Sequence, residues 1–458
     1  MEKDKILRCI SSALTDAGIN SGAQLLVGLS GGADSTALLV ALRELGYGVE
    51  ALHCNFELRG RESDGDEARC RALCRQHNVG LHVRHFRTQA YARRNGVSVE
   101  MAARRLRYEW FAEMSASLGA AAVCVGHHRD DNVETLLLNL VRGTGLRGLT
   151  GMRPVRRMDN GLVVLRPLLE VARADIEAWL QARDITWCTD STNLDPDAAQ
   201  RNSIRLQVVP LLERLHTGAA QRIAATAQRL SEAEALYDDA LARATESVVH
   251  TVGKHKAIDV QALMATPAPR TVLHELLSPY GFHSAEVADI FAHLDGDAGH
   301  VWHSSSGTRV LRDRGNLLIE NDISHSRVGD ESDEVMYLPL EGLATTATGT
   351  RIMVRRMAVG PDFVVPREAA TVCLDLHKLT LPLVVRRVAS GDRFRPFGMT
   401  GTRLVSDYLT DAKVSLFDKE RQLVVCSGDK IVWLVGHRAA DGFAIDSHSR
   451  HAMTLTVL

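Results

Sequence analysis

Apolar and polar positions follow different patterns in different parts of the chain. Up to about residue 200, short apolar runs alternate with stretches in which apolar residues recur every three or four positions, as on one face of a helix. Strands that alternate with helices in this way form a parallel α/β sheet. We therefore predict an α/β domain whose sheet contains strands at 24–30, 49–56, 81–86, 121–128 and 162–169.

The pattern changes in the rest of the chain. Apolar residues keep helical spacing over about 217–250, which predicts one long amphipathic helix. Further helices are predicted near Pro269 and after Ser284, with Ser284 as N-cap, and the polar residues 323–335 indicate a linker. The last ~120 residues contain short β-branched runs between turn residues. We predict an α/β domain, a helical domain and a small α+β domain at 1–215, 216–330 and 331–458.

Composition indicates a soluble protein of the cytoplasm. The 458 residues are 45% hydrophobic and 24% charged, as in ordinary globular proteins, and are too many for one compact core. No apolar run approaches the roughly 18 residues that span a bilayer, and the N-terminus lacks a signal-peptide core, so we expect no membrane association. The eight cysteines form no C-x-x-C pair, which favours free thiols.

Charge is distributed unevenly, although the formal net charge is only −2. Residues 84–107 contain seven arginines against one acid, Glu100. Residues 142–173 contain seven more against Asp159 and Glu170. Some of these arginines are expected only to solvate helix faces, but their concentration in one third of the chain favours a polyanionic partner such as a nucleic acid.

The stretch S-G-G-A-D-S at 30–35 follows the first predicted strand and opens a helical pattern. Glycines there let backbone N–H groups approach a ligand, and the helix N-terminus attracts anions. The stretch is neither a Walker loop nor a dinucleotide fingerprint. The simpler alternative is a turn in which Asp34 or Ser35 caps the helix. Asp34 would repel phosphate unless Mg²⁺ bridges the two.

With this placement, S-G-G-x-D-S resembles the pyrophosphate loop of the N-type ATP pyrophosphatases. Members of that superfamily adenylate a carbonyl-type oxygen, release pyrophosphate, and let a nucleophile displace AMP. The resemblance implies a parallel-sheet ATP pyrophosphatase domain at the N-terminus. It also implies that ATP is bound by Ser30, Gly31, Gly32, Ala33, Asp34 and Ser35.

Further motifs are similar to those of the tRNA(Ile)-lysidine synthetases within this superfamily. The N-terminal motifs begin at His53, Glu100, Gly126, Arg166 and Asp190, and continue in R-N-S-I-R at 201–205. Phe56 departs from the family's usual histidine. In the tail, the motifs that begin at Gly391, Pro396, Asp407, Asp411 and Trp433 resemble the family's tRNA-binding domain. The resemblance covers nearly the whole chain.

Two of these motifs also fit simpler structural roles. Glu100 and Arg104, four positions apart on a helix, could form an ordinary surface ion pair. Asp131 and Glu134 spell a D-x-x-E capping box, which accounts for neither the paired histidines nor the paired aspartates at 127–131. A zinc site there is disfavoured, because no cysteine accompanies the cluster and carboxylates suit Mg²⁺.

The resemblance implies that the chain ligates free L-lysine to carbon 2 of the wobble cytidine in the CAU-anticodon isoleucine tRNA. It implies ATP and Mg²⁺ as cofactors, an adenylated cytidine intermediate, and a change of codon reading from AUG to AUA. Asp34, Asp131 and His127 are then the catalytic candidates, and Asp34 and Asp131 the candidate Mg²⁺ ligands. The candidates for contacts with cytosine, lysine or tRNA are Arg104, Arg107, Glu134, Arg201, Asn202 and Arg205.

Three alternatives remain to be compared with this interpretation. A tRNA thiolase of the same superfamily would usually need reactive cysteines or an iron–sulfur cluster. A GMP or NAD synthetase would need a source of ammonia. A non-catalytic nucleotide-binding protein would not need so many acids beside a polyanion. The sequence leaves the oligomeric state open, with a homodimer as one option.

Overall fold

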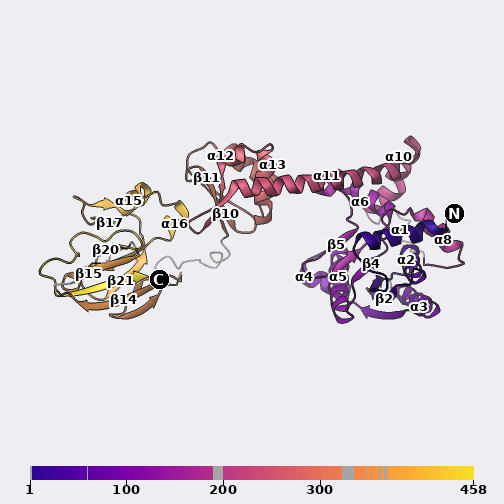
Figure 1. Cartoon of the computed structure of the whole chain (residues 1–458), viewed down its shortest axis with the longest axis horizontal. Coiled ribbons are helices and arrows are strands. Elements are labelled where there is room, and N and C mark those ends of the chain that lie inside the picture. The colour runs from indigo at the N-terminus through magenta and orange to yellow at the C-terminus, as the bar shows by residue number, and fades with distance from the viewer. Residues whose placement is uncertain are drawn as a thin grey trace. The chain divides into compact units, whose positions relative to one another are not determined.

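The computed structural model of the chain consists of two compact units, residues 1–239 and 240–458 (Figure 1). It describes residues 3–58, 60–188, 200–321, 335–347, 349–360, 363–365, 368 and 370–458. None of the helices in these ranges is long and apolar enough to span a membrane. The predicted boundaries 1–215, 216–330 and 331–458 stay a prediction, because the chain divides into only two compact units.

The first unit is built on a six-stranded sheet of order β3-β2-β1-β4-β6-β5. All neighbouring strands are parallel except β5, which is antiparallel to β6. The predicted strands are confirmed, with shorter bounds in most cases. The strands are β1 (Gln24–Gly28), β2 (Gly48–Asn55), β3 (Gly80–His85), β4 (Ala122–Val125), β5 (Val155–Arg157) and β6 (Val163–Leu165).

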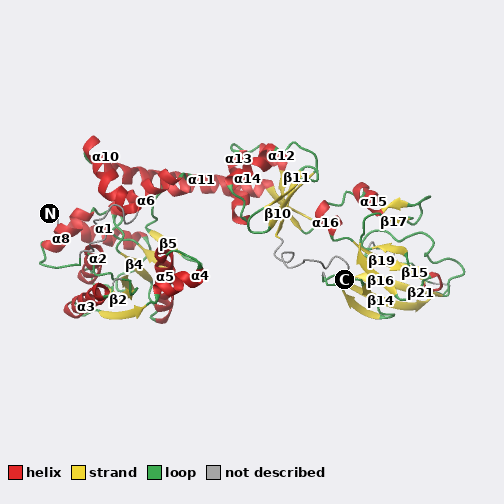
Figure 2. Cartoon of the chain, turned by 180° about the vertical axis from the view of Figure 1, so that it is seen from behind, coloured by secondary structure: helices red, strands yellow, loops and turns green. Residues whose placement is uncertain are grey.

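Helices cover both faces of this sheet (Figure 2), as the side chains of β1 require. Leu25 and Val27 point to one face, where they share a core with α1 (Lys3–Asp16), α2 (Ala33–Glu44), α3 (Arg61–Gln76) and α8 (Arg173–Gln181). Leu26 points to the other face, where it packs with the aromatic side chains of α5 (Val99–Ser117). A strand that is apolar on both sides must be buried on both sides, and this fixes the three-layer arrangement.

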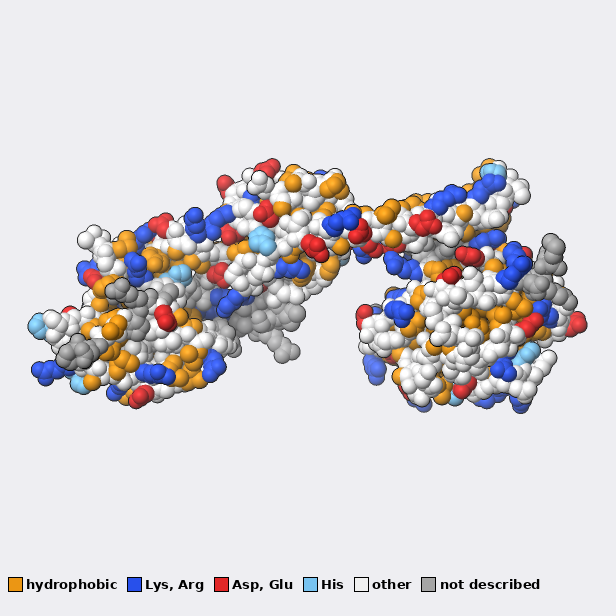
Figure 3. Space-filling view, viewed as in Figure 1, with side chains coloured by type: hydrophobic (Ala, Val, Ile, Leu, Met, Phe, Trp, Pro, Cys, Tyr) orange, Lys and Arg blue, Asp and Glu red, His pale blue; other side chains and the backbone are white. Residues whose placement is uncertain are grey.

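The first unit contains further helices. They are α4 (Thr88–Asn95), α6 (Arg129–Arg142), α7 (Leu146–Leu149), α9 (Gln200–Ser203), a π-helical turn at Ile204–Val208, and α10 (Val209–Leu215). The long helix α11 (Ala219–Val248) confirms the helix predicted at 217–250. Arg214, Arg222 and Arg229 are exposed on α10 and α11, and Lys and Arg side chains are visible along these two helices in Figure 3.

The second unit begins with a five-stranded antiparallel sheet that was not predicted from the sequence. Its order is β7-β8-β11-β10-β9. The helices of this region agree with the pattern, but α14 starts at Ser284 itself and its N-cap is His283, so the predicted N-cap was wrong by one residue. The elements are β7 (Val249–Val252), β8 (His255–Asp259), α12 (Val260–Met264), α13 (Pro269–Leu277), α14 (Ser284–Ala292), β9 (Val301–His303), β10 (Thr308–Asp313) and β11 (Asn316–Asn321).

The C-terminal part is mostly β with short helices, as predicted. Two four-stranded sheets of order β12-β16-β19-β20 and β13-β14-β21-β15 share one apolar core. The first sheet contains β12 (Met336–Tyr337), β16 (Leu383–Arg387), β19 (Leu423–Ser427) and β20 (Lys430–Leu434). The second contains β13 (Gly342–Thr345), β14 (Arg351–Ala358), β15 (Thr371–Asp375) and β21 (His451–Val457). The smaller elements are β17 (Arg393–Phe394), β18 (Arg403–Leu404), α15 (Val405–Asp411) and α16 (Leu416–Glu420). The predicted linker lies outside the described residues, except for its last position.

Candidate active site at the carboxyl ends of strands β1 and β4

The S-G-G-A-D-S stretch forms a tight loop between β1 and α2. Gly31 has a φ of +88°, and a Cβ there would lie 3.1 Å from the Cys188 sulfur, so only glycine fits without strain. The loop is closed by Ser30 and Ser35, whose hydroxyl oxygens are 3.1 Å apart. The N-cap of α2 is Gly32, and it has no side-chain cap. The alternative of a turn capped by Asp34 or Ser35 was therefore wrong.

Asp34 lies at the start of α2 in a crowded place. Gly126, at the end of β4, allows the close approach, because a Cβ there would lie 2.9 Å from the backbone carbon of Asp34. Burial raises the pKa of Asp34, although the nearby His128 and Arg173 oppose this effect. Among the described residues, its buried Oδ1 accepts no hydrogen bond. A buried carboxylate oxygen without a donor is suited to a cation.

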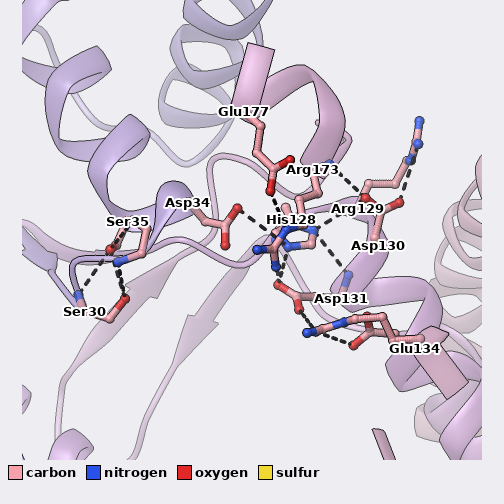
Figure 4. Close-up of polar contacts among 12 residues, drawn as sticks. Ser30, Asp34, Ser35, His128, Arg129, Asp130, Asp131, Glu134, Arg173 and Glu177 are labelled. Atoms are coloured by element: carbon pink, nitrogen blue, oxygen red, sulfur yellow. Dashed lines mark hydrogen bonds and ion pairs between the residues drawn. The ribbon is translucent and has the colours of Figure 1, made fainter. Parts of the chain in front are cut away.

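His128 organises the start of α6, between the two aspartates (Figure 4). Its Nδ1 accepts the backbone N–H of Asp131 at 3.4 Å, and Asp131 Oδ2 accepts the backbone N–H of His128 at 3.1 Å. This reciprocal capping box begins three residues before the Asp131–Glu134 box that was considered as the simpler alternative, and that alternative is wrong. His128 Nε2 then lies 3.7 Å from Asp34 Oδ1 and 3.5 Å from Asp131 Oδ2.

Two arginines hold Glu134 on the inner side of α6. The Glu134 side chain is 2% exposed. Its Oε1 accepts Arg205 Nε at 2.6 Å, and its Oε2 accepts Arg201 Nε at 2.6 Å and Arg205 Nη2 at 3.0 Å. Arg201 Nη2 also donates to Asp131 Oδ1 at 3.0 Å. Arg205 lies in the π-helical turn, an irregularity that is common at functional sites.

The two acids on α6 therefore differ in their surroundings. Burial alone would raise the pKa of Asp131, but its electrostatic interactions with His128 and Arg201 outweigh this effect, and the pKa is lowered. Asp131 also lines a cavity of about 240 Å³. Glu134 does not line this cavity, and both of its oxygens are occupied by guanidinium groups. Of these two acids, Asp131 is thus the one that borders the cavity.

The cavity opens beside the S-G-G-A-D-S loop. Its polar side is formed by Ser30, Asp34, Ser35, His127 and Asp131, and its apolar side by Leu52, Cys54, Phe56, Tyr108, Phe111 and Val125. Arg107 also lines it, and its guanidinium carbon lies 5.3 Å from the centre of the Phe56 ring. Phe56 itself stacks on Phe86. The departure from histidine at position 56 thus supplies an aromatic support for Arg107.

Arg104 and Asn202 lie apart from this cavity lining. Among the described residues, Arg104 forms no ion pair with Glu100, and its guanidinium carbon lies 5.2 Å from the centre of the Tyr108 ring. The surface ion pair considered for these two residues is therefore not formed. Asn202 is buried on α9. The predicted motif at Asp190–Asn193 lies outside the described residues.

Arg166 was predicted only as the start of a motif and was not among the candidate site residues. It follows β6 and is 6% exposed. It donates from Nε to His127 Nδ1 at 3.2 Å and from Nη1 to the Arg153 carbonyl at 2.6 Å. A buried arginine at the carboxyl end of a strand was the signal that could have identified it.

The fold and the loop define a PP-loop protein. A family model described as "PP-loop domain" matches residues 3–212, and models described as "TilS substrate binding domain" and "TilS substrate C-terminal domain" match 251–323 and 383–455. The tRNA(Ile)-lysidine synthase of Parabacteroides distasonis is 44% identical, and that of Bacteroides thetaiotaomicron 41%, each with 95% of both chains covered. The chain belongs to the tRNA(Ile)-lysidine synthase family.

Among solved structures, the U34-tRNA thiolase NcsA from Methanococcus maripaludis is similar over 50% of this chain and 79% of its own length. The TM-score is 0.42 and the sequence identity 16%. This likeness is too low to assign an activity.

Proposed function

We propose that this chain ligates free L-lysine to carbon 2 of the wobble cytidine in the isoleucine tRNA with a CAU anticodon, which changes its codon reading from AUG to AUA. In the first step the cytosine O2 attacks the α-phosphorus of ATP, and the bond to the β-phosphate breaks to release pyrophosphate. In the second step the ε-amino nitrogen of lysine attacks carbon 2, the C2–O2 bond breaks, and AMP leaves with that oxygen. The lysine ammonium group loses one proton before the attack and a second once the C2–N bond has formed, so the product nitrogen keeps one.

The observation that carries the proposal is that one cavity is bordered both by a loop suited to pyrophosphate and by a carboxylate, Asp131, suited to an amine. The Ser30–Ser35 loop forms an anion site suited to pyrophosphate. Asp34 offers an oxygen to the Mg²⁺ that would accompany the pyrophosphate. Asp131, which lines the same cavity, is linked through Arg201 to the buried Glu134 and Arg205. An enzyme that adenylates one substrate and then admits an amine needs both kinds of site within reach of one reacting atom.

Mg²⁺ fits Asp34 and Asp131. The unpartnered Oδ1 of Asp34 is a hard oxygen donor, and both carboxylates lie within 4 Å of His128 Nε2. Among the described residues there is no cluster of three or more candidate metal ligands. Mg²⁺ does not require one, since it usually binds one or two carboxylates together with waters and substrate phosphates. When bound, it would offset the negative charge that develops on pyrophosphate.

We assign the other residues by their surroundings. Asp131 is the carboxylate placed to accept or orient the lysine ammonium, whereas Glu134 holds Arg201 and Arg205 in place. Arg107 and Arg104 are candidates for contacts with cytosine or phosphate. Anticodon bases and phosphates would be held by the exposed arginines and by the modules of the second unit. We expect the reaction to occur in the cytoplasm, where tRNA and free lysine are available.

The cavity cysteine argues against a sulfur-transfer reaction. Burial raises the pKa of Cys54 to about 12, so that the sulfur is a protonated thiol and a poor nucleophile at neutral pH. The eight cysteines of the chain are free thiols.

Incorporation of radiolabelled lysine into the CAU-anticodon isoleucine tRNA tests the proposal. We expect incorporation that requires ATP and Mg²⁺ and stops when EDTA is added. Asp34→Ala should abolish pyrophosphate release while tRNA binding survives, and Asp159→Ala, which removes an exposed acid of the same unit, should leave both unchanged. Sulfur transfer without lysine incorporation would refute the proposed reaction, and adenylation by Asp34→Ala would refute the metal role.

A further inference from the structure

Arg166 is a buried cation without a carboxylate partner among the described residues. Its polar contacts are His127 Nδ1 and the carbonyl oxygen of Arg153, and Tyr108 lies close enough to interact. Burial lowers the pKa of Arg166, and the nearby positive charges of Arg156 and Arg104 add to this effect. Burying an unpaired guanidinium is costly, so a position of this kind calls for a functional reason.

The contact with His127 determines where that imidazole carries its proton. A guanidinium has only N–H donors and no acceptor. When Arg166 Nε donates to His127 Nδ1, that nitrogen must act as the acceptor and cannot carry a hydrogen. The ring is then neutral, and its single proton lies on Nε2.

The surroundings of His127 agree with a neutral ring. Burial lowers the pKa of His127 to about 4. The charge of Asp131 opposes this effect, whereas the charges of Arg166 and Arg201 add to it. His127 lines the cavity beside Ser30. Among the described residues, its Nε2 has no hydrogen-bond partner, so this N–H remains available to a ligand in the cavity.

We propose that Arg166 is a positioning residue that fixes His127 in the neutral Nε2–H tautomer. His127 then acts as a hydrogen-bond donor to an oxygen of bound ATP and does not act as a base. The choice of ATP as the acceptor rests on the proposed function, whereas the tautomer follows from the geometry of the free protein. A donor fixed before the reaction needs no reorganisation when negative charge develops on the nucleotide oxygen.

Nitrogen NMR of the full chain labelled with ¹⁵N-histidine tests the tautomer without any substrate. His127→Gln identifies the His127 signals among those of the 19 histidines. We expect an unprotonated Nδ1 and a protonated Nε2 at pH 7. A protonated Nδ1 in the wild-type protein, whether neutral or cationic, would overturn the proposal. This result requires no variant of Arg166, so a variant that fails to fold does not affect it.

Three variants separate positioning from a purely structural role. Arg166→Gln provides an amide oxygen that can accept from Nδ1–H, so we expect the tautomers to mix and pyrophosphate release to fall by about tenfold to a hundredfold. Arg166→Lys keeps a donor-only group, and should retain the tautomer and restore much of the rate. Asp159→Ala removes an exposed acid that does not contact His127, and should change neither.

Each other outcome also has a definite meaning. An unchanged tautomer in Arg166→Gln, or equal losses of rate in the glutamine and lysine variants, would show that Arg166 does not act through His127. Addition of a non-hydrolysable ATP analogue should shift the Nε2–H signal, and no shift would remove ATP as the acceptor. If the wild-type protein shows the expected tautomer but incorporates no lysine, the proposed function fails and the positioning role stands.

Discussion

The Glu134 cluster allows a quantitative prediction about how the site is held together. Glu134→Gln preserves the shape of the side chain but replaces one acceptor oxygen with an N–H donor. In the wild-type protein the two oxygens accept three N–H groups of Arg201 and Arg205 at 2.6, 2.6 and 3.0 Å. The amide can keep the contacts of one oxygen only, and its NH₂ group faces a guanidinium donor.

The size of the effect follows from these contacts. Loss of one charge-assisted hydrogen bond costs about 1.5–3 kcal/mol, and breaking a buried ion pair costs about 3–5 kcal/mol. Asp131 still faces Arg201, at 3.0 Å, and limits the loss. We therefore expect the free energy of local opening around α6 and α9 to fall by about 3 kcal/mol, which corresponds to roughly a hundredfold larger open population.

Native-state hydrogen exchange of the α6 and α9 amides in the full chain measures this opening. Glu113→Gln is the matched control. Arg84 donates two similar hydrogen bonds to Glu113, at 2.6 and 2.9 Å, but this pair lies on the surface, where the Glu113 side chain is 57% exposed. Surface pairs contribute little, so exchange in α5 should stay unchanged. If Glu134→Gln increases exchange in α6 less than tenfold, the cluster does not hold α6 and α9 together.

Two further predictions concern the loop and the C-terminal module. Gly126→Ala should lower pyrophosphate release by roughly tenfold or more, because the new Cβ would lie 2.9 Å from the Asp34 backbone, whereas Gly315→Ala, with no atom within 4 Å, should be silent in the same assay. The pKa of Asp392 is lowered, because its contacts with Arg386 outweigh burial. The stability that this ion pair contributes is therefore fully present above the unfolded pKa of about 3.9, and it is lost as pH falls through the folded pKa. Thermal unfolding should therefore separate Asp392→Asn from wild type at pH 7, and a difference that persisted unchanged at low pH would contradict this account.

The parallel sheet could be predicted because each strand carries its own signal. Strand β1 presents apolar side chains to both faces of the sheet, with Leu25 and Val27 on one face and Leu26 on the other. A short apolar run of this kind between two helical patterns strongly favours a buried strand. The five-stranded sheet of the second unit gives no such signal. Its strands have three to six residues, and a run such as His255–Asp259 fits a helical turn as well as a strand. Pairing between distant segments decides such cases, and a single sequence does not show it.

At the site, the sequence predicted features that lie within one continuous stretch, but not contacts between residues far apart in the chain. The loop at 30–35 is one continuous stretch, so its turn between strand and helix could be predicted from the sequence, and the anion site there stays a prediction. The start of α6 was ambiguous, since H-x-x-D at 128–131 and D-x-x-E at 131–134 both spell a capping box, and only packing decides between them. The contact between Glu134 and Arg201 joins residues 67 positions apart, so no local rule could have found it.

The structure also separates two aspartates that the sequence treats alike. Interactions with His128 and Arg201 outweigh burial and lower the pKa of Asp131, and both of its oxygens accept hydrogen bonds. Asp34 is buried with an oxygen that no described donor satisfies, and its pKa is raised. A divalent cation removes an electrostatic cost at Asp34 but must compete with existing partners at Asp131. Of the two candidate ligands, Asp34 should therefore contribute more to Mg²⁺ affinity.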